Sequence, residues 1–142
     1  MAQEKLDEQT KELIKKQLGY NDEEIKLIDE NPKQRDIVKN GPIFVSKKMV
    51  FTCIKAENCT FNKVGDRYVF NCFGGMIKEE CCQTPCILAM SGFLPFTFMV
   101  YDRIASGLDP AGMHLDHVAC PDTGCRYGGF GTALFKISIE DV

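Results

Sequence analysis

The chain has 142 residues and a formal net charge of -3, with 44% hydrophobic and 26% charged residues. This length provides for one compact domain with an appendage and excludes two full-sized domains. The composition excludes a disordered or fibrous protein, and the slightly acidic charge balance gives no basic footprint, so we expect no nucleic-acid partner.

Residues 1–45 are predicted to form a charged helical N-terminal extension. About half of the charged residues of the chain lie there, and it contains no Cys. Its first helix places four apolar side chains on one stripe: Leu6, Leu13, Ile14 and Leu18. Asn21 with Glu24 is typical of a capping box, and Asn31 before Pro32 is typical of a helix start. We expect the extension to dock its apolar stripe on the rest of the chain or on a second subunit.

Residues 46–142 form the second part of the chain, a Cys-rich body. Four segments have β-rich or alternating patterns that predict strands: 49–56, 67–72, 114–119 and 132–140. Between the second and third of them, Pro85 and Pro95 each occupy a position typical of the first residue of a helix, and the second helix is predicted to end near Ser106. This order predicts an α+β fold, in which the helical extension precedes a β-β-α-α-β-β body with a small curled antiparallel sheet packed on two helices.

Several short motifs occur in the body in a fixed order. They are Asn58-Cys59 before Lys63-Val64-Gly65-Asp66, Cys82-Gln83-Thr84-Pro85-Cys86 before an apolar helical stretch, and Ala119-Cys120-Pro121-Asp122 before Gly128-Gly129-Phe130-Gly131. In these motifs residues 49–140 resemble a family of small Cys-containing bacterial and archaeal proteins that is frequent in anaerobes. The resemblance implies that the N-terminal extension marks a longer subgroup, and it implies no particular activity. It also implies that four cysteines occupy Cys-bearing motifs of that family: Cys59, Cys82, Cys86 and Cys120.

The distribution of cysteines bears on the compartment. All eight Cys lie between Cys53 and Cys125, and the N-terminus has no apolar segment typical of a secretory signal. We therefore expect a cytoplasmic protein whose thiols stay reduced rather than forming a disulfide framework. The longest apolar run, from Cys86 to Val100, is short for a transmembrane helix and is interrupted by Gly and Pro. We expect no membrane span.

Two closely spaced Cys pairs predict a metal site: Cys82-x3-Cys86 and Cys120-x4-Cys125. Zinc and iron–sulfur clusters need thiolates that are close in space, and two loops that meet at one end of a sheet supply four of them. We therefore predict Cys82, Cys86, Cys120 and Cys125 as ligands of zinc or of an iron–sulfur cluster, with Cys59 as a further candidate. The alternative is that the thiols are reduced core residues and that no metal is bound.

Two functions correspond to these alternatives. The first is a small metal- or iron–sulfur-binding protein that acts as an accessory or electron-transfer subunit in anaerobic metabolism. The second is a non-catalytic oligomerisation or interaction subunit, as a homo-oligomer or as a small subunit of a larger complex. No catalytic constellation is visible, so an enzyme acting on its own is the least supported function. His114 and His117 are expected to be solvated or hydrogen-bonded, because residues three apart on a strand point to opposite faces.

Overall fold

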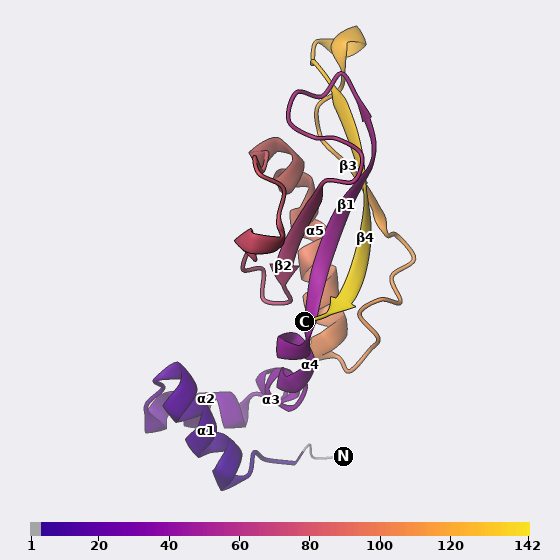
Figure 1. The fold of residues 1–142 in the computed structure, drawn as a ribbon. Coiled ribbons are helices and arrows are strands. Elements are labelled where there is room, and N and C mark those ends of the chain that lie inside the picture. The colour runs from indigo at the N-terminus through magenta and orange to yellow at the C-terminus, as the bar shows by residue number, and fades with distance from the viewer. Residues whose placement is uncertain (1–3) are drawn as a thin grey trace.

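A computed structural model of the chain describes residues 4–142, in which helices occupy the N-terminal part and an antiparallel sheet forms the centre of the body (Figure 1). The elements in chain order are α1 (Glu8–Leu18), α2 (Asp22–Glu30), α3 (Pro32–Lys39), α4 (Gly41–Ser46), β1 (Lys47–Glu57), β2 (Arg67–Asn71), the 3₁₀ turn η1 (Lys78–Glu80), α5 (Ile87–Ala105), β3 (His117–Ala119), the 3₁₀ turn η2 (Cys125–Tyr127) and β4 (Thr132–Asp141). The predicted α+β class is therefore confirmed.

The four strands lie in the order β2-β1-β4-β3, and every neighbouring pair is antiparallel. In the central strand β1, Phe51 lies opposite Tyr68 of β2 and Ile137 of β4. Alternate residues of β4 point into the core, so that Phe135 and Ile137 are buried while Lys136 between them is exposed. This alternation is the pattern from which the last strand was predicted.

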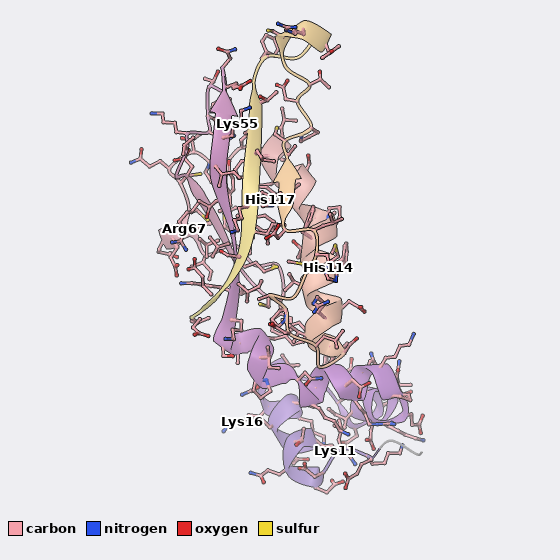
Figure 2. All side chains as sticks on the ribbon, turned by 90° about the vertical axis from the view of Figure 1, so that its right-hand side faces the viewer. Lys11, Lys16, Lys55, Arg67, His114 and His117 are labelled. Atoms are coloured by element: carbon pink, nitrogen blue, oxygen red, sulfur yellow. The ribbon has the colours of Figure 1, made fainter. Side chains whose placement is uncertain are left out.

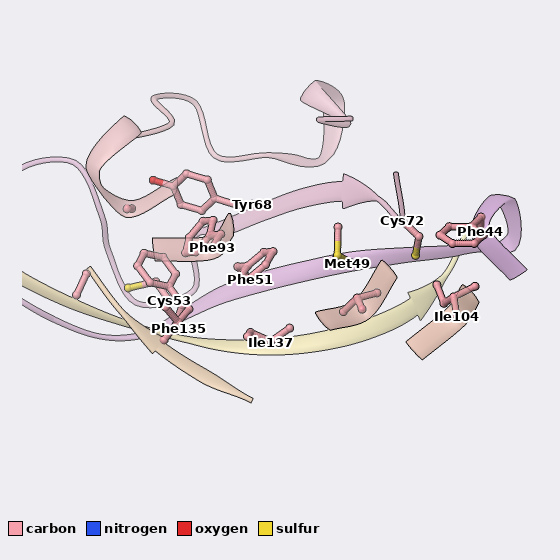
Figure 3. Close-up of a cluster of buried hydrophobic side chains, with 14 residues drawn as sticks. Phe44, Met49, Phe51, Cys53, Tyr68, Cys72, Phe93, Ile104, Phe135 and Ile137 are labelled. Atoms are coloured by element: carbon pink, nitrogen blue, oxygen red, sulfur yellow. The ribbon is translucent and has the colours of Figure 1, made fainter. Parts of the chain in front are cut away.

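Helix α5 covers one face of the sheet and completes the core (Figures 1 and 3). Its buried side chains include Phe93, whose ring stacks on Phe51 with a centroid distance of 4.1 Å. The edges of the Tyr68 and Phe135 rings pack against Phe93 at 5.2 and 5.0 Å. The core of the body is therefore an aromatic cluster held between β1, β2, β4 and α5.

The prediction of two helices in the middle of the body was wrong, because α5 is one continuous helix with Pro95 inside it. A proline in a helix removes one backbone hydrogen bond and costs about 3 kcal/mol. Here Pro95 lies on the exposed face, while Phe93, Val100 and Ile104 on the other face are buried against the sheet on both sides of it. The burial of this continuous apolar face outweighs the local preference of Pro95 for a helix start.

The N-terminal helices have the predicted caps. Asn21 and Glu24 form the capping box of α2 through reciprocal hydrogen bonds of 2.9 and 2.8 Å, and Pro32 begins α3 behind the N-cap Asn31. Helices α1, α2 and α3 share a small apolar cluster of their own, which includes Leu6, Ile14 and Ile25 and packs against Val38. The other half of the predicted stripe, Leu13 and Leu18, is exposed.

Helix α4 joins the N-terminal helices to the body. Its Phe44 is fully buried in the main core and stacks on Phe73 with a centroid distance of 4.7 Å. The helix whose start was predicted at Pro32 ends at Lys39, and after Asn40 the short helix α4 leads into β1. This packing attaches the N-terminal extension to the sheet.

Candidate functional site: a cavity lined by three thiols

Three cysteines from separate segments line one cavity of about 180 Å³. Cys59 follows β1, Cys86 is the N-cap of α5, and Cys120 follows β3 directly. Asn58, with a left-handed φ of 53°, turns the chain out of β1 just before Cys59. Three thiols that are distant in sequence therefore meet at the end of the sheet where α5 begins.

The Cys59 sulfur is held by its neighbour Asn62, which is only 2% exposed. The backbone N–H and the side-chain amide of Asn62 both donate to Cys59 Sγ, over 3.3 and 3.4 Å. Burial on its own would raise the pKa of the Cys59 thiol, but these donors, with a backbone N–H of Phe61, favour the thiolate and lower the pKa below its ordinary value. These hydrogen bonds therefore favour the thiolate, the form in which Cys binds metals and attacks electrophiles.

A buried chain of hydrogen bonds connects Cys59 to the start of α5. The hydroxyl of Tyr68, which is fully buried, donates to Asn62 Oδ1 over 2.6 Å. The same hydroxyl accepts the backbone N–H of Cys86 over 3.0 Å. Tyr68 thus holds both Asn62 and the N-terminus of α5 in position. It thereby links the Cys59 loop to the segment that carries Cys86.

Two glycines let these segments approach each other closely. At Gly92 of α5, a Cβ would lie 3.0 Å from the carbonyl oxygen of Ala119, the residue before Cys120. At Gly131, a Cβ would lie 2.5 Å from the carbonyl oxygen of Asn58 and 2.7 Å from Cys59 Cα. The Gly-rich segment 128–131, which leads into β4, therefore packs closely on the Cys59 loop.

Gly131→Ala is expected to lower the free energy of unfolding by roughly 1–3 kcal/mol, because the Ala methyl group forces the two backbones apart. Urea denaturation of the variant measures this loss. The matched control is Gly41→Ala in the first turn of α4, where no atom lies within 4 Å of the added Cβ. Equal unfolding energies for the two variants would contradict the close approach at Gly131.

The charges around the cavity favour a cation. Asp122 is the charged residue of its lining, which contains no Lys or Arg. The Asp122 carboxylate accepts the backbone N–H groups of Gly124 and Phe130 over 2.9 and 3.0 Å, and these bonds lower its pKa and keep it ionised. Burial raises the pKa of the Cys120 thiol, two residues before Asp122 in the chain. A positive ion in the cavity would stabilise both of these groups in their charged form.

The structure separates the four cysteines that were predicted as ligands. Cys86 and Cys120 line the same cavity. Cys82 lies in a neighbouring depression with Lys63 and Asp66, where burial raises the pKa of its thiol. Cys125 is exposed on η2 and does not line the cavity of the other thiols. Asn62 and Tyr68 were not predicted as site residues from the sequence, although a Tyr on the core face of a strand needs a partner for its hydroxyl.

The remaining cysteines and histidines have structural or exposed positions. Cys53 and Cys72 are buried in the core, and burial raises the pKa of both thiols. His117 is exposed on β3 and bonds through Nδ1 to Asp116 at 2.7 Å, as expected of a hydrogen-bonded His, and His114 is also exposed (Figure 2). Within residues 4–142, no three His, Cys, Asp or Glu side chains already surround a single ion position.

Comparison of the chain with protein-family models, with curated proteins and with solved structures finds no match.

In the part of the chain that the structure describes, α5 is the one helix long and apolar enough to cross a membrane, by length and composition alone. A core helix of a soluble protein passes the same test, and α5 packs one face on the sheet. It therefore gives no clear membrane span.

Proposed function

We propose that the protein is a small thiolate metal-binding protein, and that its metal site is the cavity of Cys59, Cys86 and Cys120. The observation that carries the proposal is that three thiols from three segments line one cavity that also contains a carboxylate and no basic side chain. Thiolate ligands select soft or borderline metals, so zinc, copper(I) or an iron–sulfur cluster fits this set of donors better than magnesium or calcium. The bound metal would supply a structural link or a redox centre.

The chain's own residues would perform three tasks at this site. Asn62 would hold Cys59 as a thiolate, Tyr68 would hold Asn62 and the start of α5, and Asp122 would add negative charge. The thiols do not surround one ion position as they stand, so metal binding requires Cys side chains to turn towards the centre of the cavity. Rotation about χ1, which moves a side chain between staggered positions, would supply this movement.

Metal analysis of anaerobically purified protein tests the proposal. We expect about one metal site per chain, measured as zinc, copper, iron and acid-labile sulfide, with a visible absorption band if the site holds iron and sulfide. Cys59→Ser, Cys86→Ser and Cys120→Ser should each lower the metal content at least about tenfold, because each removes a thiolate donor. A folded protein that is free of metal after anaerobic purification would overturn the proposal.

Two further variants decide between the ligand sets. Cys125→Ser is the matched control, because Cys125 is exposed on η2 and should leave the metal content unchanged. Cys82→Ser tests the neighbouring depression in the same way. Loss of metal in these two variants with retention in Cys59→Ser would support the ligands predicted from sequence spacing and exclude Cys59.

The second candidate function is a non-catalytic interaction subunit with reduced cysteines. It is supported by the exposed apolar side chains of α5, which the rest of the chain leaves uncovered. In either case the motif resemblance in residues 49–140 supports membership of the small Cys-containing family that is frequent in anaerobes. The role of an accessory or electron-transfer subunit belongs to the metal-binding function alone. The eight free thiols support a reducing compartment such as the cytoplasm.

A further inference from the structure

Helix α5 carries a continuous apolar stripe on the side that faces away from the sheet. No charged residue occurs between its first residue, Ile87, and Tyr101. Seven residues of this segment are exposed: Ile87, Leu88, Ser91, Leu94, Pro95, Phe98 and Met99. The opposite side of the helix is buried against the sheet, so the stripe is not part of the core of its own chain.

The spacing of this stripe places its residues along one side of the helix. Ile87, Ser91, Leu94 and Phe98 follow each other at intervals of four, three and four residues. Alternating intervals of this kind keep one side of a helix facing a partner helix over several turns. The apolar stripe ends at the exposed Asp102, one turn after Phe98. The stripe therefore fits another helix of about the same length.

The exposed area is large enough for a specific contact. The five large apolar side chains of the stripe are between 37% and 76% exposed. At roughly 150–250 Å² for a fully exposed aromatic side chain, taken as an upper bound for Ile, Leu and Met, they present at most about 600 Å². Two such surfaces together bury up to about 1,200 Å², the lower end of the range for specific protein interfaces.

We propose that this stripe binds the same stripe of a second copy, with the two α5 helices antiparallel. A twofold axis between Ser91 and Leu94 places each Leu94 against the small Ser91 of the partner subunit, and each Ile87 against Phe98 of the partner subunit. A parallel pair would instead place Phe98 against Phe98 and leave a gap between the two serines. The antiparallel pairing thus matches large side chains with available space, and twofold symmetry makes every contact occur twice.

The composition of α5 favours a second copy over a lipid surface. Helices that lie in a membrane interface carry several Lys or Arg on their polar side, which contact anionic lipid headgroups. The one basic residue of α5 is Arg103, and its Nε donates to the carbonyl oxygen of Asp109 over 2.7 Å. The pairing is independent of metal binding, although Leu88 also lines the thiol cavity, so that Phe98 of the partner subunit would lie beside its mouth.

Sedimentation velocity of the full chain under reducing conditions tests the proposal, over protein concentrations from about 1 µM to about 1 mM. The wild-type protein should dimerise in this range. Phe98→Glu should weaken the dimer at least about 30-fold, because it replaces an aromatic contact that twofold symmetry makes twice with a buried charge. Val64→Glu is the matched control, because Val64 is 67% exposed, like Phe98 at 66%, and lies outside the stripe.

A charge-pair variant tests the orientation. In the antiparallel pair, Ile87→Lys combined with Phe98→Glu places each new Lys against a new Glu and should restore much of the lost affinity, whereas a parallel pair would place Glu against Glu. A protein that stays monomeric at every concentration, or a dimer that Phe98→Glu leaves unchanged, would overturn the proposal. Absence of rescue would overturn the antiparallel arrangement. A monomer that binds phospholipid vesicles through Phe98 would assign the stripe to a membrane and also overturn the proposal.

Discussion

Replacing Phe93 by Ala is expected to lower the free energy of unfolding by about 3–5 kcal/mol. Phe93 is 2% exposed, and it is the side chain through which α5 contacts the aromatic rings of three strands (Figure 3). The truncated side chain leaves a cavity that the surrounding rings cannot fill, because they are held by the sheet. Urea denaturation followed by circular dichroism measures the change.

The control for this experiment is Phe130→Ala, since Phe130 is 84% exposed. The same chemical change at that position should alter the free energy of unfolding by no more than about 0.5 kcal/mol. A loss of less than about 1 kcal/mol in Phe93→Ala would mean that α5 does not pack on the sheet as described.

The second large effect is expected for Tyr68→Phe, which removes only a hydroxyl group. Its loss leaves two groups without this partner, the buried Asn62 Oδ1 and the part-buried backbone N–H of Cys86. A buried unsatisfied group costs about 1–3 kcal/mol and a part-buried one costs less, so the variant should lose about 2–4 kcal/mol of unfolding free energy. The rate at which iodoacetamide alkylates Cys59, followed by mass spectrometry, should also change in this variant. The reason is that Asn62, which donates to Cys59 Sγ, loses its hydrogen bond from Tyr68.

Tyr127→Phe serves as the control for the hydroxyl deletion, because Tyr127 is exposed at η2. It should leave both the stability and the alkylation of Cys59 unchanged. If Tyr68→Phe behaved like this control, the hydrogen-bond chain from Cys59 to α5 would not contribute to the site.

Local patterns in the sequence were sufficient for the fold class. The alternation of Phe135 and Ile137 with polar residues predicted β4, and the Asn21 side chain with Glu24 predicted the start of α2, since both signals act between residues a few positions apart. The continuous α5 could not be predicted in this way. Its continuity depends on the burial of Phe93 and Val100 against a sheet formed largely by distant segments, which outweighs the local signal of Pro95.

The thiol cavity was predictable only in part. Cys86 and Cys120 were predicted from the spacing of the Cys pairs, and they do line one cavity. Spacing cannot tell which member of a pair points towards a common site, and Cys82 and Cys125 face other surroundings. Cys59, the further candidate from the sequence, lines the cavity where Asn58 adopts a left-handed φ and Gly131 allows close approach, two features that depend on the folded structure.

Anaerobic titration of the reduced protein with Co²⁺ is the most direct test of the central claim, because thiolate ligation gives a charge-transfer band that oxygen ligands do not. The account predicts that this band saturates at about one ion per chain in the wild-type protein and in Cys125→Ser, and that Cys59→Ser lacks it. No band in the wild-type protein, or a band that Cys59→Ser retains and Cys125→Ser loses, would contradict a metal site formed by Cys59, Cys86 and Cys120.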